Sequence, residues 1–525
     1  MALSSVFTMN NTPLIQALSK AETYPHPVTT VRLLETHISW VFLTGAYAYK
    51  IKKPVNFGFL DFSTLALRQS CCHEEIRLNQ RLAKDLYLDV IAITGTPEQP
   101  VLGGTGEAFE YAVKMREFPA GFTLSERAGC GQLSLSEIDQ MTDIIASFHQ
   151  TISRTDAASA YGEGACIRHW FNENFTAIAP LLADPRQHQQ LQDLQRWGQQ
   201  QGEQLATLMQ ARKNQGFVRE CHGDLHLSNM TLINGQVTLF DCIEFNPALR
   251  WVDVLSDVAF LLVDLSHFGY GQFAHRLLNR YLQATGDYAS LALLPYYWVY
   301  RAMVCAKIAL LRHDQLNIGQ DCASYQAFAD LASAYAAPRQ PILIITHGYS
   351  GSGKSTCASV LAETLGAVQI RSDIERKRLF GLQTLADSHS AVGGGIYTSA
   401  AAQQTYQHLR ACAKAVLSAG YTAIVDGAFL QVWQRQLFAD LAAELGVAFV
   451  ILDMLASESV LVARIEQRLG DASEATTAVL QQQLLSAEPL QAQELQQRLC
   501  INADTGMDVA AVVAALAARN ASFKH

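Results

Sequence analysis

The sequence lacks an uninterrupted apolar run, a basic N-terminus and an excess of positive charge. Its most apolar stretch, residues 291–311, is broken by Pro295, Arg301 and Lys307, and a charge at the centre of a membrane helix costs ~2.5–3.5 kcal/mol. No lysine or arginine precedes Lys20, and no small-residue cleavage site follows an apolar core. We therefore expect no membrane partner, no secretory signal and a cytoplasmic location.

Paired cysteine motifs are also missing. The eleven cysteines are scattered, none lies in a C-x-x-C arrangement, and only Cys71 and Cys72 are adjacent. We interpret them as reduced thiols that serve as packing residues. The formal net charge of −9 disfavours non-specific binding to nucleic acid or to an anionic membrane. It is compatible with a local basic pocket for a phosphate.

The length of 525 residues, with 49% hydrophobic residues, predicts two to four domains with ordinary buried cores. Two prolines, Pro338 and Pro341, interrupt a helical pattern and predict a boundary between a domain at 1–335 and a domain at 340–525. Before the boundary we expect short strands and then helices, with strands at 31–35, 39–44, 46–52 and 110–118 and helical stretches at 67–83, 135–209 and 253–336.

After the boundary, apolar strand-like runs alternate with helical segments, which is typical of a parallel α/β sheet. The strand-like runs are residues 342–346, 367–370, 423–426 and 448–453. The Gln- and Leu-rich tract 479–498 has leucines at helical spacing and is predicted to be one amphipathic helix.

The clearest motif is G-x-x-x-x-G-K-S, which starts at Gly348 and ends at Ser355. It follows a predicted buried strand and precedes a predicted helix, which is the setting of a phosphate-binding loop. In such a loop the backbone N–H groups face the phosphates, Lys354 bridges them, and the Ser355 hydroxyl coordinates Mg²⁺. The predicted nucleotide-binding residues are Gly348, Ser350, Gly351, Ser352, Gly353, Lys354, Ser355 and Thr356.

Charged residues downstream of this loop are candidates for the chemistry. Asp373 follows a strand and can accept a proton from an acceptor hydroxyl, or it can cap a helix. Asp426 ends another strand and can reach Mg²⁺, or it is a turn residue. Arg464 and Arg468 lie four apart, either as a lid over the transferring phosphoryl group or as a solvated helix face.

This half resembles the small P-loop kinases, with polynucleotide kinases, gluconate kinases and zeta toxins as relatives. The resemblance rests on residues 348–355, on the segment Arg371-Ser-Asp, and on the two arginines with the following residues 471–475. It implies a mononucleotide-binding α/β domain. These motifs do not identify the acceptor.

A second motif, H-x-D-x-x-x-x-N, places His222, Asp224 and Asn229 before two short strands joined by an Asn-Gly turn, and Asp241 follows the second strand. Asp224 can accept the proton of an attacking hydroxyl, while Asn229 and Asp241 can hold Mg²⁺. A polar surface loop is the alternative, but it leaves unexplained why three such groups flank a tight apolar hairpin.

This second block resembles aminoglycoside phosphotransferases and the wider choline-kinase-like, protein-kinase-like fold. The resemblance implies a small ATP-binding lobe at about 25–120 and a large lobe at about 121–335. Lys50 would then be the phosphate-pairing lysine, with Lys52 as a rival, and Glu75 its ion-pair partner, with Glu74 as an alternative. The lysines can also be read as solvated charges at a sheet edge. The glycine-rich phosphate loop of such kinases is missing.

Two acids on the next predicted helix, Asp253 and Asp257, either brace the catalytic loop or cap the helix. Taken whole, the chain resembles the bifunctional aminoglycoside phosphotransferase/ATP-binding proteins. The predicted fold is thus an α+β protein-kinase-like, bilobal N-terminal domain followed by an α/β P-loop domain with a parallel sheet.

Two hypotheses of function follow. The first is a two-module, Mg²⁺- and ATP-dependent phosphotransferase that acts on hydroxyl groups of small molecules; a polynucleotide end stays open for the C-terminal half, although the acidic balance disfavours it. The second is an ATP-binding regulatory protein with a switch-like P-loop domain and a pseudokinase scaffold. A degenerate scaffold loses its catalytic carboxylates, and Asp224, Asn229 and Asp241 are all present, which favours the enzyme. The sequence gives no oligomeric state.

Overall fold

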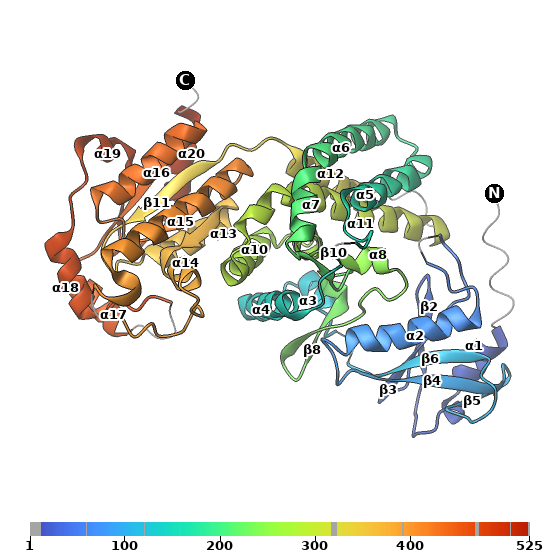
Figure 1. Cartoon of the computed structure of the whole chain (residues 1–525). Helices are drawn as coiled ribbons and strands as arrows, with labels where there is room; N and C mark the ends of the chain where they lie inside the picture. The colour runs from blue at the N-terminus through green and yellow to red at the C-terminus, as the bar shows by residue number, and fades with distance from the viewer. Residues whose placement is uncertain are drawn as a thin grey trace. The chain divides into compact units, whose positions relative to one another are not determined.

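In the computed structural model, contacts between residues divide the chain into two compact units, which are described separately (Figure 1). The first comprises Met1–Met141, Ser147–Phe171 and Gln204–Asp264, and the second Thr142–Ala146, Asn172–Glu203 and Leu265–His525. The structure describes residues 12–58, 60–119, 121–156, 158–316, 323–390, 393–467, 472–504 and 506–522. The domain boundary at 335–340 stays a prediction.

The first unit opens with an antiparallel sheet whose described strands run in the order β1-β2-β3-β6-β4-β5. The strands are β1 (Arg32–Glu35), β2 (Ser39–Leu43), β3 (Tyr47–Lys52), β4 (Tyr87–Thr96), β5 (Gln99–Leu102) and β6 (Glu110–Arg116). Side chains alternate along a strand, so Lys50 and Lys52 share one face of β3, while Tyr49 and Ile51 face the other.

One helix, α2 (Leu65–Asn79), packs against β4 and β6 of this sheet. It starts after Thr64, whose hydroxyl accepts a hydrogen bond from the Leu67 N–H. Its buried face carries Arg68, Cys72 and Glu75 at helical spacing, so it turns an arginine and a glutamate inward. The short helices α1 (Thr12–Leu18) and η1 (Ala21–Thr23) precede the sheet.

The predicted Asn-Gly hairpin lies between β8 (Met230–Ile233) and β9 (Gln236–Leu239). Asn234 and Gly235 have φ of 51° and 76°, the left-handed pair that a two-residue hairpin turn requires. The short turn η3 (Leu227–Asn229) leads into it, and β7 (Val218–Glu220) pairs with β10 (Trp251–Asp253) beside it. The hairpin therefore sets Asn229 and Asp241 at its open end.

The other described helices up to residue 336 come before and after this hairpin in the sequence. They are α3 (Leu124–Gly129), α4 (Leu135–Thr151), α5 (Gly164–Ile178), η2 (Ala179–Leu181), α6 (Pro185–Gln204), α7 (Ala206–Asn214), α8 (Pro247–Arg250) and α9 (Val254–His267). The next group is α10 (Gly271–Thr285), η4 (Tyr288–Ala292), α11 (Leu294–Leu316) and α12 (Ala323–Ala336). Together they confirm the prediction of a strand-rich region followed by a helix-rich one.

The second unit contains a parallel sheet with the described strand order β12-β13-β11-β14-β15. The strands are β11 (Ile342–His347), β12 (Val368–Arg371), β13 (Ala423–Asp426), β14 (Ala448–Leu455) and β15 (Arg498–Asn502). The helices are α13 (Lys354–Leu365), α14 (Ser372–Leu379), η5 (Gly395–Tyr397), α15 (Ser399–Ser418), α16 (Val432–Leu445), α17 (Glu458–Glu466), α18 (Thr477–Ser486), α19 (Ala492–Gln497) and α20 (Val509–Ser522). The predicted parallel α/β sheet is confirmed.

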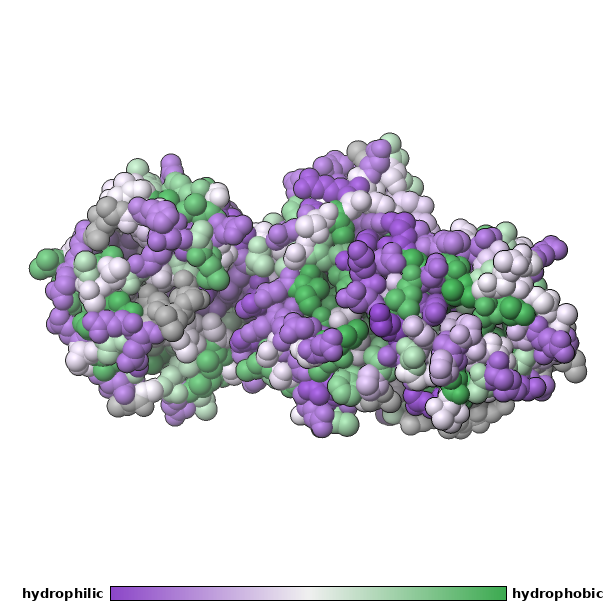
Figure 2. Space-filling view, turned by 90° about the horizontal axis from the view of Figure 1, so that it is seen from below, coloured by the Kyte–Doolittle hydropathy of each residue, from purple (hydrophilic) through white to green (hydrophobic). Residues whose placement is uncertain are grey.

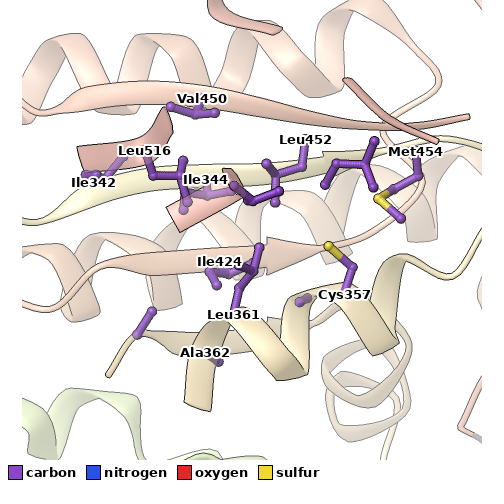
Figure 3. Close-up of a cluster of buried hydrophobic side chains, with 14 of the residues drawn as sticks. Ile342, Ile344, Cys357, Leu361, Ala362, Ile424, Val450, Leu452, Met454 and Leu516 are labelled. Atoms are coloured by element: carbon purple, nitrogen blue, oxygen red, sulfur yellow. The ribbon is translucent and has the colours of Figure 1, made fainter. Parts of the chain in front are cut away.

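The core of this sheet is apolar on the side that α13 covers. Figure 3 shows Cys357 and Leu361 of α13 turned toward Ile344 of β11 and Ile424 of β13, and all four side chains are buried. The helix that follows the phosphate-binding loop is therefore anchored by ordinary core packing, which fixes the loop at the carboxyl end of β11.

The prediction of one helix over 479–498 is wrong. Helix α18 ends at Ser486, the chain turns at Glu488 and Pro489, and α19 ends before β15 begins at Arg498. A proline restricts the residue before it to an extended conformation, so the helix cannot continue through Glu488. The leucine periodicity spans this break and conceals it.

Polar and apolar residues are interleaved over the face of the molecule seen in Figure 2. Among the described helices, none combines the length and the hydropathy that crossing a membrane requires. The apolar stretch 291–311, flagged in the sequence, lies in η4 and α11 and contributes many of the buried residues of this region.

Candidate functional sites

Two lysines of β3 and one glutamate of α2 form the centre of the first site. Lys50 Nζ lies 2.9 Å from Glu75 Oε1 and also pairs with Asp241. Lys52 Nζ lies 2.7 Å from Glu75 Oε2 and also pairs with Glu244. Glu75 is thus the partner of the lysines, and the alternative, Glu74, pairs instead with Arg77 and Arg250.

The charges in this cluster stabilise one another. Burial raises the pKa of Glu75, but Lys50 and Lys52 outweigh it and lower that pKa to about 2. Burial lowers the pKa of Lys50, yet Asp241 and Glu75 hold it well above its usual value. The pKa of Glu244 is raised because its burial is only partly offset by Lys52.

The two lysines differ in what they can reach. The Lys52 side chain is 1% exposed and lies between Glu75 and Glu244, whereas Lys50 contacts Asp241, whose side chain is 37% exposed. A ligand at this site would therefore meet Lys50 and Asp241 before it could reach Lys52. This geometry favours Lys50 as the lysine that faces a nucleotide.

The H-x-D-x-x-x-x-N segment folds into a compact loop around Asp224. Asn229 donates from Nδ2 to Asp224 Oδ2 at 2.9 Å, and His226 Nε2 lies 3.2 Å from the same oxygen. Because the Asn229 amide nitrogen is directed to Asp224, its amide oxygen is the atom left to bind a metal. The structure therefore brings together the predicted base and one predicted metal ligand.

Asp257 of α9 supports this loop through contacts with its backbone. The backbone N–H groups of His222 and Gly223 donate to its carboxylate at 3.1 Å and 2.9 Å. Of the two readings left open for Asp257, bracing of the loop is the one that the contacts show, while Asp253 pairs with Arg212. A further acid that the sequence did not single out, Asp264, accepts from the Leu227 N–H at 2.7 Å.

The backbone at Asp241 is left-handed, with φ of 64°. Its N–H donates to the Tyr87 hydroxyl at 3.2 Å, and the neighbouring Phe240 N–H donates to Asn229 O at 2.9 Å. The latter bond places Asn229 next to the start of the Asp241 segment. A carboxylate and an amide oxygen at one hairpin end fit Mg²⁺, which prefers oxygen ligands.

The phosphate-binding loop of the second unit needs its glycines. Gly348, Gly351 and Gly353 have φ of 136°, 83° and 86°. A Cβ atom at Gly348 would lie 2.7 Å from Met454 O, and one at Gly351 would lie 2.6 Å from Leu461 O. Lys354 curls over the loop and donates from Nζ to Tyr349 O at 2.6 Å. The segment 348–355 therefore has the shape that the sequence predicted.

Asp426 lies at the carboxyl end of β13, beside Ser355. Its carboxylate lies 3.7 Å from Arg371 Nε, and Ser355 is close enough to lower its pKa. Burial raises the pKa of Asp426, although Arg371, Ser355 and Lys354 act against this. The Ser355 hydroxyl and the Asp426 carboxylate are oxygen donors that fit Mg²⁺.

Gln369 is a further member of this cluster, and no sequence motif points to it. Its Nε2 donates to Asp426 Oδ2 at 3.1 Å and to Ser355 O at 3.3 Å. Glutamine in a strand carries no motif signal, and only the pairing of β12 with β13 brings it to Asp426.

Asp373 and Arg376 lie in the first turns of α14, directly after β12. Arg376 Nη1 is 3.9 Å from the Asp373 carboxylate, and the guanidinium lies over the Tyr397 ring at 4.7 Å. The Asp373 side chain is 28% exposed, so it is accessible to a ligand. An acid and an arginine thus lie together at the carboxyl end of a strand.

Of the two arginines predicted to form a lid, Arg464 lies in α17 and contacts the phosphate-binding loop. Its Nη1 lies 3.5 Å from Gly351 O, and its Nη2 donates to Ala503 O at 2.8 Å. Arg468 and Asp471 lie outside the described residues. Gln483 of α18, which the sequence did not flag, accepts from the Ser350 N–H at 2.9 Å. Helices α17 and α18 therefore both touch the phosphate-binding loop.

The topology defines a chain of two parts. The first part is an α+β region that opens with an antiparallel sheet, and it is followed by a P-loop domain with a parallel sheet. A family model described as an AAA domain matches residues 343–490. The predicted fold class is confirmed.

The chain also has a relative along most of its length. The uncharacterised protein Rv2004c of Mycobacterium tuberculosis is 30% identical over 460 residues, which cover 86% of this chain and 90% of that protein. The chain belongs to the same family as Rv2004c.

Two solved structures match one part each. A choline/ethanolamine kinase family protein from Mesorhizobium loti is 12% identical, with a TM-score of 0.37, over 62% of this chain and 94% of that one. A putative kinase from Chloroflexus aurantiacus is 21% identical, with a TM-score of 0.28, over 34% of this chain and 99% of that one.

Proposed function

We propose that the chain is a two-module phosphotransferase, in which each half transfers the γ-phosphoryl group of ATP to a hydroxyl group of a small molecule. The observation that carries this proposal is the cluster in which Lys50 pairs with both Glu75 and Asp241. Kinase-type phosphoryl transfer requires a lysine–glutamate pair of this kind and, beside it, an aspartate that can hold Mg²⁺.

In the N-terminal half, Lys50 would pair with the phosphates of ATP, and Asp224 would act as the base. The acceptor oxygen attacks the γ-phosphorus, its proton passes to an Asp224 carboxylate oxygen, and ADP leaves. Asn229 and Asp241 would hold Mg²⁺, which neutralises charge on the phosphates when it is bound. The contacts of Asn229 and His226 with Asp224 Oδ2 would hold the carboxylate in one orientation for this step.

In the C-terminal half, residues 348–356 would wrap the phosphates, with Lys354 between them. Ser355 and Asp426 would hold Mg²⁺, and Asp373 would accept the proton of the acceptor hydroxyl. The Arg376 guanidinium lies near Asp373 and the Arg464 guanidinium lies near Gly351, and both would stabilise the negative charge that develops on the transferring phosphoryl group. Arg468 would complete this set.

The test is transfer of phosphate from γ-labelled ATP into a cytoplasmic metabolite extract, with wild type, Asp224→Ala and Lys354→Ala side by side. We expect labelled products that are each lost in one variant, which assigns an acceptor to one half. The same product lost in both variants indicates coupled modules. A wild type that binds ATP but labels nothing contradicts the proposal.

A second candidate, an ATP-binding regulatory protein with a pseudokinase half, is favoured by the turn between β1 and β2. There the Ser39 N–H donates to the Thr36 hydroxyl at 3.0 Å, in place of a glycine-rich loop over phosphates. Nucleotide binding without transfer, in wild type and in Asp224→Asn alike, is the outcome that selects this candidate.

A further inference from the structure

Strand β12 lies at the edge of the parallel sheet, and helix α10 of the same unit packs along it. Figure 1 shows α10 beside α13. The outward backbone groups of an edge strand need partners when they are buried. Asn279 of α10, 7% exposed, supplies two: Nδ2 donates to Ala367 O at 2.9 Å, and Oδ1 accepts from the Gln369 N–H at 2.7 Å.

The Gln369 side chain continues inward from this point. It is 2% exposed, and its Nε2 donates to both Asp426 Oδ2 and Ser355 O. Its Oε1 accepts from the Ser359 hydroxyl at 2.9 Å and lies 3.4 Å from Gln283 Nε2 of α10. Every polar atom of this side chain therefore has a partner, which fixes the amide in one orientation.

Two other residues of α10 contact α13 and do not contact Gln369. His275 Nδ1 lies 2.7 Å from Glu363 O, and Arg276 Nη1 lies 2.7 Å from Glu363 Oε1. These contacts attach α10 to the P-loop domain at a point remote from Asp426. They provide an internal control, because their loss loosens the helix but leaves the hydrogen bonds of Asn279 and Gln369 intact.

We propose that Asn279 and Gln369 are positioning residues for the C-terminal site: Asn279 holds β12, and Gln369 holds the Asp426 carboxylate against Ser355. The inference rests on the proposed nucleotide site of that half. We call the hydrogen bonds from Asn279 through Gln369 to Asp426 the relay. The relay starts on α10, which lies before the predicted domain boundary at 335–340. A helix outside the P-loop sequence therefore completes the P-loop site.

The test measures binding of a fluorescent ATP analogue by the full chain, with Mg²⁺ titrated in and with EDTA. The signal of Lys354→Ala is subtracted, so that only the C-terminal site is followed. The variants are Asn279→Ala and Gln369→Leu, with Arg276→Ala as the matched control on the same helix. Thermal unfolding of each variant is recorded in parallel.

Loss of a residue that orients a metal ligand lowers metal affinity about 10–100-fold. We therefore expect Asn279→Ala and Gln369→Leu to raise the Mg²⁺ concentration for half-saturation about tenfold, with nucleotide affinity in EDTA unchanged. Arg276→Ala should change neither. If Gln369→Leu does not fold, Asn279→Ala carries the test.

Two results overturn the relay. One is an Asn279→Ala variant that matches Arg276→Ala in both measurements. The other is an equal loss of nucleotide affinity with and without Mg²⁺ in all three variants, which makes α10 a purely structural support. A wild-type signal that Lys354→Ala does not reduce refutes the nucleotide site itself, and with it the proposed function of this half.

Discussion

Lys50 and Lys52 project from one face of β3 and both bind Glu75, but their second partners differ. Lys52 is enclosed with Glu244, whereas Lys50 reaches the half-exposed Asp241. The sequence placed both lysines on one face and could not rank them, because the difference lies in residues about 190 positions away. Spacing along a strand fixes the face of a side chain but not what approaches that face.

Replacing each lysine separates their roles. Lys52→Met leaves one oxygen of Glu75 and all of Glu244 buried without a counter-charge, and breaking a buried pair costs about 3–5 kcal/mol. Lys50→Met leaves Glu75 with Lys52 and should cost less. We expect Lys50→Met to abolish nucleotide binding by the N-terminal half, and Lys52→Met mainly to lower the free energy of unfolding.

Denaturant titration and equilibrium nucleotide binding check both expectations, with Lys354→Ala as the background that silences the other half. Equal losses of stability and of binding in the two variants would mean that the lysines are interchangeable.

The low pKa of Glu75 makes the stability of the first unit depend on pH. A carboxyl whose pKa falls from 4.5 to about 2 on folding stabilises the fold above pH 4.5, and this contribution disappears as the pH falls to about 2. The difference corresponds to about 3 kcal/mol. The raised pKa of Glu244 acts in the opposite direction.

We expect Glu75→Gln to flatten the acid limb of stability between these two pH values. Urea unfolding of wild type and variant across this range is the measurement, with the exposed Glu98→Gln as the control. An unchanged acid limb in Glu75→Gln would show that other groups carry the acid sensitivity.

The phosphate-binding loop and α17 approach each other at Gly351, where a Cβ atom would lie 2.6 Å from Leu461 O. Gly351→Ala must therefore separate the loop from α17 or unwind the loop. We expect ATP binding by the C-terminal half to fall at least about tenfold, since one displaced contact of about 1.4 kcal/mol is a factor of ten.

Gly446→Ala is the matched control for this substitution. Gly446 also has a positive φ, 63°, but no heavy atom of the described residues lies within 4 Å of the position that a Cβ would occupy there. It should lose about 1–2 kcal/mol of stability and keep its ATP affinity. Equal binding losses in the two variants would attribute the effect to backbone strain rather than to the contact with α17.

Helix α2 shows why some elements were predictable and their roles were not. Its helical nature follows from its sequence, although the predicted range 67–83 ends four residues beyond Asn79. Its buried face carries Arg68 and Glu75, so no apolar stripe marks the side that faces the sheet. Strands β4 and β5 were missed for a related reason: β4 is largely half-buried and lacks a clear alternation. Hydrophobic patterns identify cores, whereas a site built from buried charges interrupts them.

The two motifs, by contrast, were readable in full because their chemistry is local. Residues 348–355 and the loop from His222 to Asn229 each bring their groups together within a few residues of chain. Gln369, Asp264 and Gln483 were not readable, because each reaches its site only through tertiary packing.

Across the whole chain, α10 is the element that the predicted boundary at 335–340 separates from β12. A fragment of residues 340–525 would lack Asn279 and leave Ala367 O and the Gln369 N–H exposed at a strand edge. We expect it to aggregate, and a fragment of residues 271–525 to stay monomeric with a higher unfolding temperature. Size-exclusion chromatography with light scattering compares the two. A monodisperse 340–525 fragment of equal thermal stability would contradict this.

Because α10 covers the edge strand β12, it also affects whether the gene could be divided into two at the predicted domain boundary. Two domains joined end to end can be separated again at their junction whenever each domain carries its own complete core. Here the codons for α10 lie upstream of the predicted domain boundary. A gene split at that boundary would leave the edge strand β12 without the helix that covers it. A split that keeps α10 with β12 would have to fall before residue 271. The N-terminal product would then lack the helices from α10 to α12. Separation of the two halves is therefore expected to be disfavoured by the single helix that carries Asn279.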